Sequence, residues 1–118
     1  MLGVDKLNTI VGRKFTSEGG AVTDTGISVN KGYFGGALLV LSTLQWSNGD
    51  GTSAQLDLVQ LGYSNDSIHA ETIKFSSSSS YAAGHSIAYG ISSNKTLTIA
   101  STGGCNATCR VIMVERFT

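Results

Sequence analysis

Short apolar segments separated by turn-forming residues are the feature that most constrains the fold of this chain. About seven such segments follow one another at intervals of roughly 8 to 14 residues, and none has the 3.6-residue period of a helix. The chain holds 15 glycines and no proline, so glycine, asparagine and serine supply its turns. This pattern predicts an all-β fold, an antiparallel β-sandwich of jelly-roll type.

Two segments are apolar on both faces of the expected strand. Residues 37–41 read Ala-Leu-Leu-Val-Leu, and residues 111–114 read Val-Ile-Met-Val. A strand with two apolar faces is typically covered on both sides. The sequence leaves two explanations open: both faces fill the core of one chain, or one face contacts another copy in a homo-oligomer.

The clearest turn lies in residues 47–52, which contain both Asn-Gly and Asp-Gly. In the segment that follows, residues 54–63, the apolar positions switch from Leu56 and Leu58 to Val59 and Leu61, which predicts a β-bulge. Alternation predicts further strands over 22–29, 68–75, 87–91, 97–99 and 109–117. Residues 1–20 are expected to be a lead-in or edge segment, residues 21–118 a single sandwich domain, and the serine tract 76–80 a surface loop.

Length and charge exclude several classes of protein. At 118 residues the chain is one domain, and its eight basic and eight acidic residues leave no net charge. It therefore lacks the positive surface with which proteins grip nucleic acid or an anionic membrane. Its longest wholly apolar run, residues 37–41, is far shorter than the roughly 20 residues that cross a bilayer, so we expect no membrane insertion. The N-terminal residues do not have the pattern of a secretory signal.

The sequence holds no catalytic or metal-binding motif. Cys105 and Cys109 would lie roughly 13 Å apart on one extended strand, so we expect two free thiols, with a small-loop disulfide as the alternative. His69 and Glu71 share a face of one strand but would need a third ligand from elsewhere to hold a metal ion. There is no Gly-x-Ser-x-Gly motif. We therefore predict a non-enzymatic protein with no cofactor and no metal.

Aromatic residues beside short polar ones are the candidates for ligand binding, because aromatic rings stack on sugar rings while amides and hydroxyls satisfy sugar hydroxyls. They occur at two expected strand ends and around the serine tract: Trp46, Asn48 and Asp50; Tyr63, Asn65 and Asp66; Tyr81 and His85. The first two groups flank one strand and would lie at its opposite ends, roughly 35 Å apart. For Trp46, partial burial in the core is the competing explanation.

The order of these segments resembles a known class of domain. Residues 35–41, the glycine-aspartate turn, residues 54–63 followed by Asn65-Asp66, and the later pair of strands over 87–99 are similar to the small C-terminal β-sandwich domains of bacteriophage tail fibres and tailspikes. The resemblance covers roughly residues 20–118. It implies a homotrimer in the virion tail, or otherwise at the extracellular surface, that binds a receptor or polysaccharide of the host cell.

Two other functions remain open at this point. The first is purely structural: trimerisation, capsid decoration or tail assembly without a host ligand. The second is a lectin-like carbohydrate-binding module unconnected with a virus.

Overall fold

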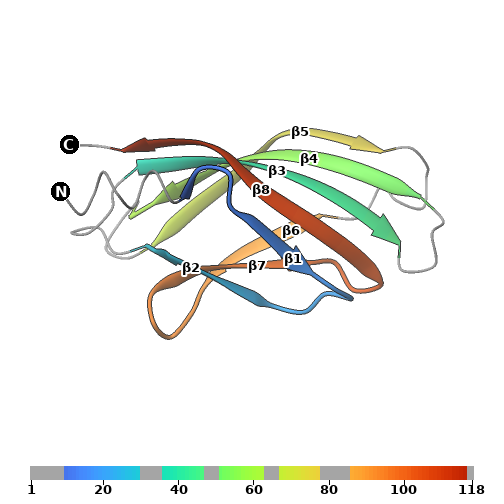
Figure 1. Cartoon of the computed structure of the whole chain (residues 1–118), viewed down its shortest axis with the longest axis horizontal. Coiled ribbons are helices and arrows are strands. Elements are labelled where there is room, and N and C mark those ends of the chain that lie inside the picture. The colour runs from blue at the N-terminus through green and yellow to red at the C-terminus, as the bar shows by residue number, and fades with distance from the viewer. Residues whose placement is uncertain (1–9, 30–35, 47–50, 63–66, 78–85, 117–118) are drawn as a thin grey trace.

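The protein is an antiparallel β-sandwich of eight strands (Figure 1). The computed structural model describes residues 10–29, 36–46, 51–62, 67–77 and 86–116. In these ranges no helix is long and apolar enough to cross a membrane. The strands are β1 (Lys14–Ser17), β2 (Thr23–Ser28), β3 (Gly36–Trp46), β4 (Thr52–Leu61), β5 (Ile68–Ser77), β6 (Ile87–Ile91), β7 (Thr96–Ser101) and β8 (Cys105–Arg116).

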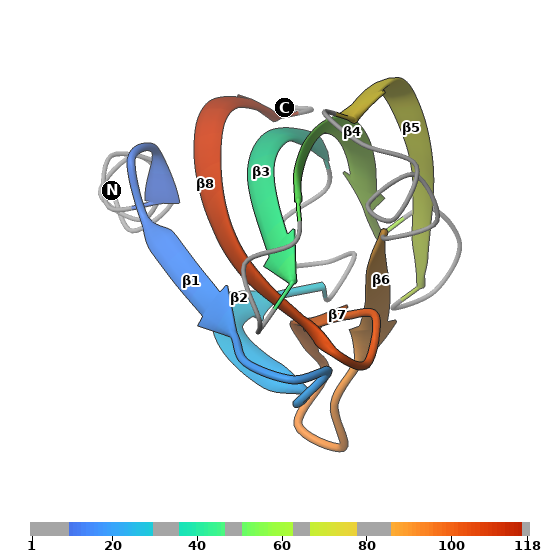
Figure 2. The ribbon, with the colours of Figure 1, turned by 90° about the vertical axis from the view of Figure 1, so that its right-hand side faces the viewer.

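The strands form two sheets of unequal size. The large sheet has the order β1-β8-β3-β4-β5 and the small sheet the order β2-β7-β6. Figure 2 shows the large sheet arching over the small one. The predicted all-β sandwich is confirmed: β1–β8 and β2–β7 are nested pairs as in a jelly roll, while β3, β4 and β5 follow one another as a meander.

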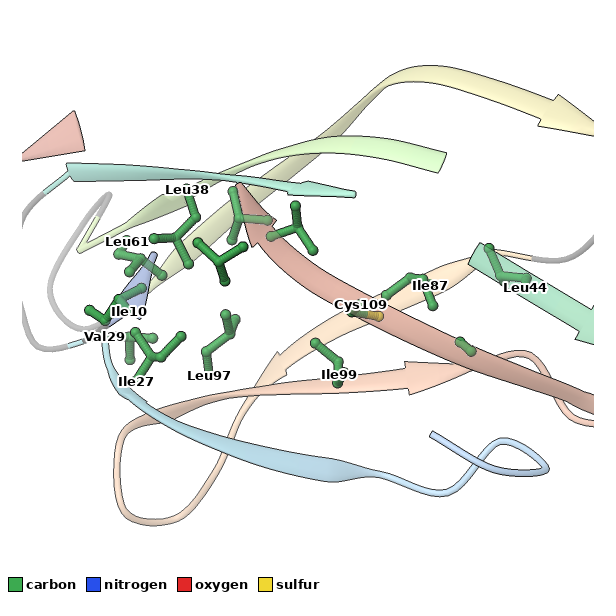
Figure 3. Packing of buried hydrophobic residues seen from close by; sticks show 14 of the residues in the cluster. Ile10, Ile27, Val29, Leu38, Leu44, Leu61, Ile87, Leu97, Ile99 and Cys109 are labelled. Carbon is green, nitrogen blue, oxygen red and sulfur yellow. The ribbon is translucent and has the colours of Figure 1, made fainter. Parts of the chain in front are cut away.

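The core lies between the sheets. Alternate residues of β3 point inward, and Leu38, Val40 and Leu44 are buried there. The small sheet contributes Leu97 and Ile99 from β7 (Figure 3). This burial of apolar side chains is the main term that stabilises the fold.

The doubly apolar segments are covered on one side only. β3 is central in the large sheet, between β8 and β4, and its inward residues fill the core. On the opposite side, however, Leu41 of β3 and Met113 of β8 are exposed. The core of the single chain therefore accounts for one apolar face of each segment and leaves the other uncovered among the described residues.

The β-bulge predicted within residues 54–63 is wrong. β4 alternates without interruption, and its buried residues are Ser53, Gln55, Asp57, Val59 and Leu61. The register shift between Leu56 and Asp57 arises because β5 carries the extra residue, Ile73. A second extra residue, Ile112, lies in β8 opposite β3.

The last strand begins earlier than predicted. β8 starts at Cys105 instead of Cys109, because the turn is made by residues 102–104, where Gly104 has φ +81°. Both cysteines are buried on the inner face of β8, and both are free thiols, as expected. Their register partners on β3 are Trp46 and Ser42.

Candidate ligand-binding site

One end of the large sheet carries a row of small polar side chains on its outer face, the side turned away from the small sheet. Pairing places Thr43 between Thr108 of β8 and Ala54 of β4. These positions alternate with the buried Leu44 and Ser53, so they point outward. Hydroxyl and amide groups from four strands therefore share one surface at the Trp46 end.

This surface is hollowed. A hollow of about 500 Å³, called the polar hollow below, lies there, within the range typical of small-ligand sites. It is lined by Thr43, Leu44, Gln45, Thr52, Ser53, Ala54, Ser76, Ser77, Asn106, Ala107 and Thr108. None of these lining residues carries a charge. Its hydroxyls and amides both donate and accept hydrogen bonds, which suits a neutral, polyhydroxylated ligand.

Trp46 stands at this end of β3 but does not line the polar hollow. Its position continues the inward series of β3, and its side chain is half-buried. A Cβ added at Gly104 would lie 2.7 Å from the Trp46 ring atom Cζ3, so the ring packs closely over that glycine. Partial burial of Trp46 is thus observed, while its stacking on a ligand stays a prediction.

The other sequence-predicted binding residues lie outside the described residues: Asn48, Asp50, Tyr63, Asn65, Asp66, Tyr81 and His85. The chain order still relates them to the polar hollow. Residues 47–50 join β3 to β4 beside Gln45 and Thr52, and residues 78–85 follow directly after Ser77. Residues 63–66 follow Gly62 at the opposite end of β4, and that the two predicted loops do not form one site within a chain stays a prediction.

A buried polar network lies on the inner face of the large sheet. The Asp57 carboxylate, 1% exposed, accepts hydrogen bonds from Gln55 Nε2 (2.8 and 2.9 Å), Thr72 Oγ1 (2.8 Å) and the Tyr89 hydroxyl (2.6 Å). Tyr89 belongs to β6, so this last bond joins the small sheet to the large one. A buried carboxylate with this many donors is satisfied and holds the sheets in register.

The network shifts the acidity of its neighbours. Burial, together with the hydrogen bond to Asp57, raises the pKa of Tyr89 well above its ordinary value of 10.0. Burial also raises the pKa of the Cys109 thiol, and the charge of Asp57 adds to this rise. Both groups are therefore neutral at physiological pH, and neither is prepared for nucleophilic chemistry.

A second groove, of about 380 Å³, runs between β5 and β6 and reaches this network. Asp57, Thr72 and Tyr89 line it, and His69 and Glu71 belong to its β5 wall. His69 Nε2 lies 3.0 Å from Glu71 Oε1 in an exposed pair. Among the described residues, no three His, Cys, Asp or Glu side chains come together as metal ligands.

Sequence reasoning missed both the polar hollow and the Asp57 network. The hollow combines residues from four strands, and only strand pairing reveals that they are neighbours. The network was missed because the predicted β-bulge would bring both apolar sets of residues 54–61 to one face, whereas the structure keeps a single alternation and turns Gln55 and Asp57 inward. The alternation of Asp57 with Val59 and Leu61 was the available signal.

Comparisons with known proteins find similar solved structures. No protein-family model matches the sequence, and no curated protein matches it. The tailspike protein of the Acinetobacter phage vB_ApiP_P1 is similar in structure, with a TM-score of 0.39 and 22% sequence identity. The match covers 91% of this chain and 19% of the tailspike chain, so the chain spans about a fifth of the tailspike's length.

Proposed function

We propose that this chain is a non-enzymatic attachment module of a bacteriophage tail fibre or tailspike, and that it binds a neutral glycan of the host surface in the polar hollow. The observation that carries the binding proposal is the lining of that hollow: hydroxyls and amides from four strands, with no charged side chain. The placement in the virion tail rests on the sequence resemblance over roughly residues 20–118.

The chemistry of the lining favours a sugar over other small ligands. Thr43, Thr52 and Ser76 are exposed and present hydroxyls, and Gln45 presents an amide that donates and accepts. Among the described residues that line the hollow, an anionic or cationic ligand would find no opposite charge. The residues that line the hollow belong to paired strands, so their backbone is held in place before a ligand arrives.

A purely structural role is the second candidate function, and the uncovered apolar residues on the outer face of the large sheet favour it. The homotrimer implied by the sequence resemblance belongs to this candidate as well as to the first. A measurement of the solution mass tests whether the chain forms an oligomer, and a glycan-binding measurement tests the polar hollow. The two properties can therefore be tested separately.

Binding is tested with an array of bacterial surface polysaccharides, followed by calorimetric titration of a neutral oligosaccharide that the array identifies. The double variant Thr43→Val/Thr108→Val removes two hydroxyls from the hollow and keeps the side-chain shape. Because a neutral hydrogen bond contributes about 0.5 to 1.5 kcal/mol, affinity should fall on the order of tenfold. Thr98→Val, on β7 of the small sheet, is the matched control and should bind as the wild type does.

Two results would contradict the proposal. If the folded protein binds no polysaccharide on the array and no host cell, the structural candidate replaces it. If the double variant binds as tightly as Thr98→Val, the ligand lies outside the polar hollow, and the loops that hold Asn48, Tyr81 and His85 become the place to search.

A further inference from the structure

Two basic side chains lie side by side on the outer face of the large sheet, one on β1 and one on β8. Strand pairing sets Lys14 of β1 directly opposite Arg110 of β8. Arg110 stands between the buried Cys109 and Val111, so its side chain points outward, and Lys14 shares that face because it is the register partner of Arg110. Both residues are exposed. We call Lys14 and Arg110 the basic pair.

Among the described residues, the basic pair has no acidic partner. The ion pair that the described ranges contain joins His69 and Glu71 on β5, at the far edge of the large sheet. On its other side Arg110 faces Leu41 of β3, which carries no charge. Like charges that lie opposite one another on neighbouring strands repel and cost stability. An anion bound between the two side chains would remove this cost and gain charge-assisted hydrogen bonds.

The basic pair borders the polar hollow. Thr108, which lines the hollow, lies two residues before Arg110 on β8 and points the same way, about 7 Å along the strand. Pairing continues this row of hydroxyls from Thr108 to Thr43 on β3 and to Thr16 on β1. Diagonal neighbours at this spacing are within reach of long side chains. A ligand that fills the hollow and extends toward β1 therefore meets the guanidinium of Arg110.

The chemistry of the basic pair selects an oxyanion. The Arg110 guanidinium presents N–H donors in a planar fork, which matches two oxygens of a carboxylate or of a phosphate ester. The Lys14 ammonium adds a second positive charge and three further donors. Two cations are too few for the series of phosphate contacts with which proteins hold nucleic acid. The basic pair therefore fits a single anionic substituent.

We propose that the basic pair is an anion-binding subsite beside the polar hollow, and that the natural ligand is a glycan whose unit next to the hollow carries a carboxylate or a phosphate. This inference rests on the proposed function, because it extends the ligand of the polar hollow by one unit. The neutral unit meets the hydroxyls and amides of the hollow, and the anionic group of the adjoining unit binds between Lys14 and Arg110. A neutral oligosaccharide fills the hollow but lacks this second contact.

Calorimetric titration with matched oligosaccharides tests the subsite. The probes are the neutral oligosaccharide that the array identifies, its forms with one primary hydroxyl oxidised to a carboxylate, and its forms with one primary hydroxyl phosphorylated. The positional isomers are separated and titrated one by one. We expect at least one anionic form to bind the wild type about tenfold more tightly than the neutral parent. Added salt should reduce this gain, because it screens exposed charges. The series with the larger gain identifies the oxyanion.

Variants of the basic pair locate the gain. In each variant the measured quantity is the ratio of the Kd of the neutral parent to the Kd of the anionic form. Arg110→Gln and Lys14→Gln should each lose most of the gain. Arg110→Lys keeps the charge without the planar fork, so it should retain only part of it. Lys95→Gln removes the same charge in the turn between β6 and β7 and is the matched control, which should keep the full gain.

The possible results separate this inference from the proposed function. If no oligosaccharide binds the folded protein, the proposed function is contradicted and the subsite with it. If the neutral parent binds and no anionic form binds more tightly, the inference alone is overturned. The same conclusion follows if Arg110→Gln and Lys95→Gln show equal gains, because the anionic group then lies away from the basic pair.

Discussion

The two halves of the sandwich interior are built from the same strands but held together differently. Toward the start of β3 and the end of β4, Leu38 and Leu61 pack against Leu97 of the small sheet (Figure 3). Toward the other end, β4 turns Gln55 and Asp57 inward, and hydrogen bonds reach Tyr89 of β6. The apolar half gains stability from undirected burial, whereas the polar half adds directed bonds that fix how one sheet lies on the other.

The largest expected effect lies in the apolar half. Leu38→Ala removes a fully buried side chain and leaves a cavity, so the free energy of unfolding should fall by about 3 kcal/mol, measured by urea denaturation. Ile91→Ala is the control, because Ile91 of β6 is partly exposed and its truncation should cost clearly less. Equal losses in the two variants would show that the apolar half does not dominate stability.

The second largest expected effect concerns the end of the polar half, where the Trp46 ring lies over Gly104. Gly104 has a positive φ, and a new Cβ there would come within 2.7 Å of the ring. Gly104→Ala should therefore cost about 2 kcal/mol, from backbone strain and displacement of the ring. Trp46 is the only tryptophan, so the fluorescence maximum reports that displacement directly.

The neighbouring glycine provides the matched control for this change. A Cβ added at Gly103 would meet nothing within 4 Å. Gly103→Ala should leave both stability and tryptophan emission close to the wild type. If the two alanine variants behave alike, the contact between Trp46 and Gly104 contributes nothing to closing this end of the sandwich.

The contrast between the halves also explains what the sequence could predict. Alternation located strands such as β3, β4 and β7 because each of them buries one face, and turn residues located most of their ends. In residues 54–61 the pattern is ambiguous, since Leu56 and Leu58 are as apolar as Val59 and Leu61. The choice of inward face is made by tertiary packing, and the partners of Asp57 at Thr72 and Tyr89 are 15 and 32 residues away.

The candidate site was less predictable than the fold for the same reason. The sequence pointed to eight candidate binding residues, namely Trp46 and seven residues in expected loops rich in asparagine, aspartate and serine. The structure describes only Trp46 among these eight. The polar hollow consists of ordinary threonines, serines and amides that local sequence does not single out. Strand pairing brings these side chains together, because it sets Thr43 beside Thr108 and Gln45 beside Asn106.

The smallest effect concerns a single oxygen atom of the polar half and depends on pH. Tyr89→Phe removes the donor of the 2.6 Å bond to Asp57, while Gln55 and Thr72 continue to satisfy the carboxylate. Near neutral pH the free energy of unfolding should therefore fall by about 1.5 kcal/mol. In the wild type, Tyr89 should also make the free energy of unfolding fall at alkaline pH.

The sign of this pH dependence follows from the raised pKa of Tyr89. Above pH 10.0 the unfolded chain releases the Tyr89 proton while the folded chain keeps it, so the folded state binds more protons and stability falls as pH rises. One such group contributes about 1.4 kcal/mol per pH unit. The Tyr89→Phe variant lacks this contribution, so its deficit should shrink and then vanish roughly one pH unit above 10.0, in urea denaturation at successive pH values. Stability curves that stay parallel up to that pH would mean that Tyr89 ionises as readily in the folded protein as in the unfolded chain, and that the polar half is open to water.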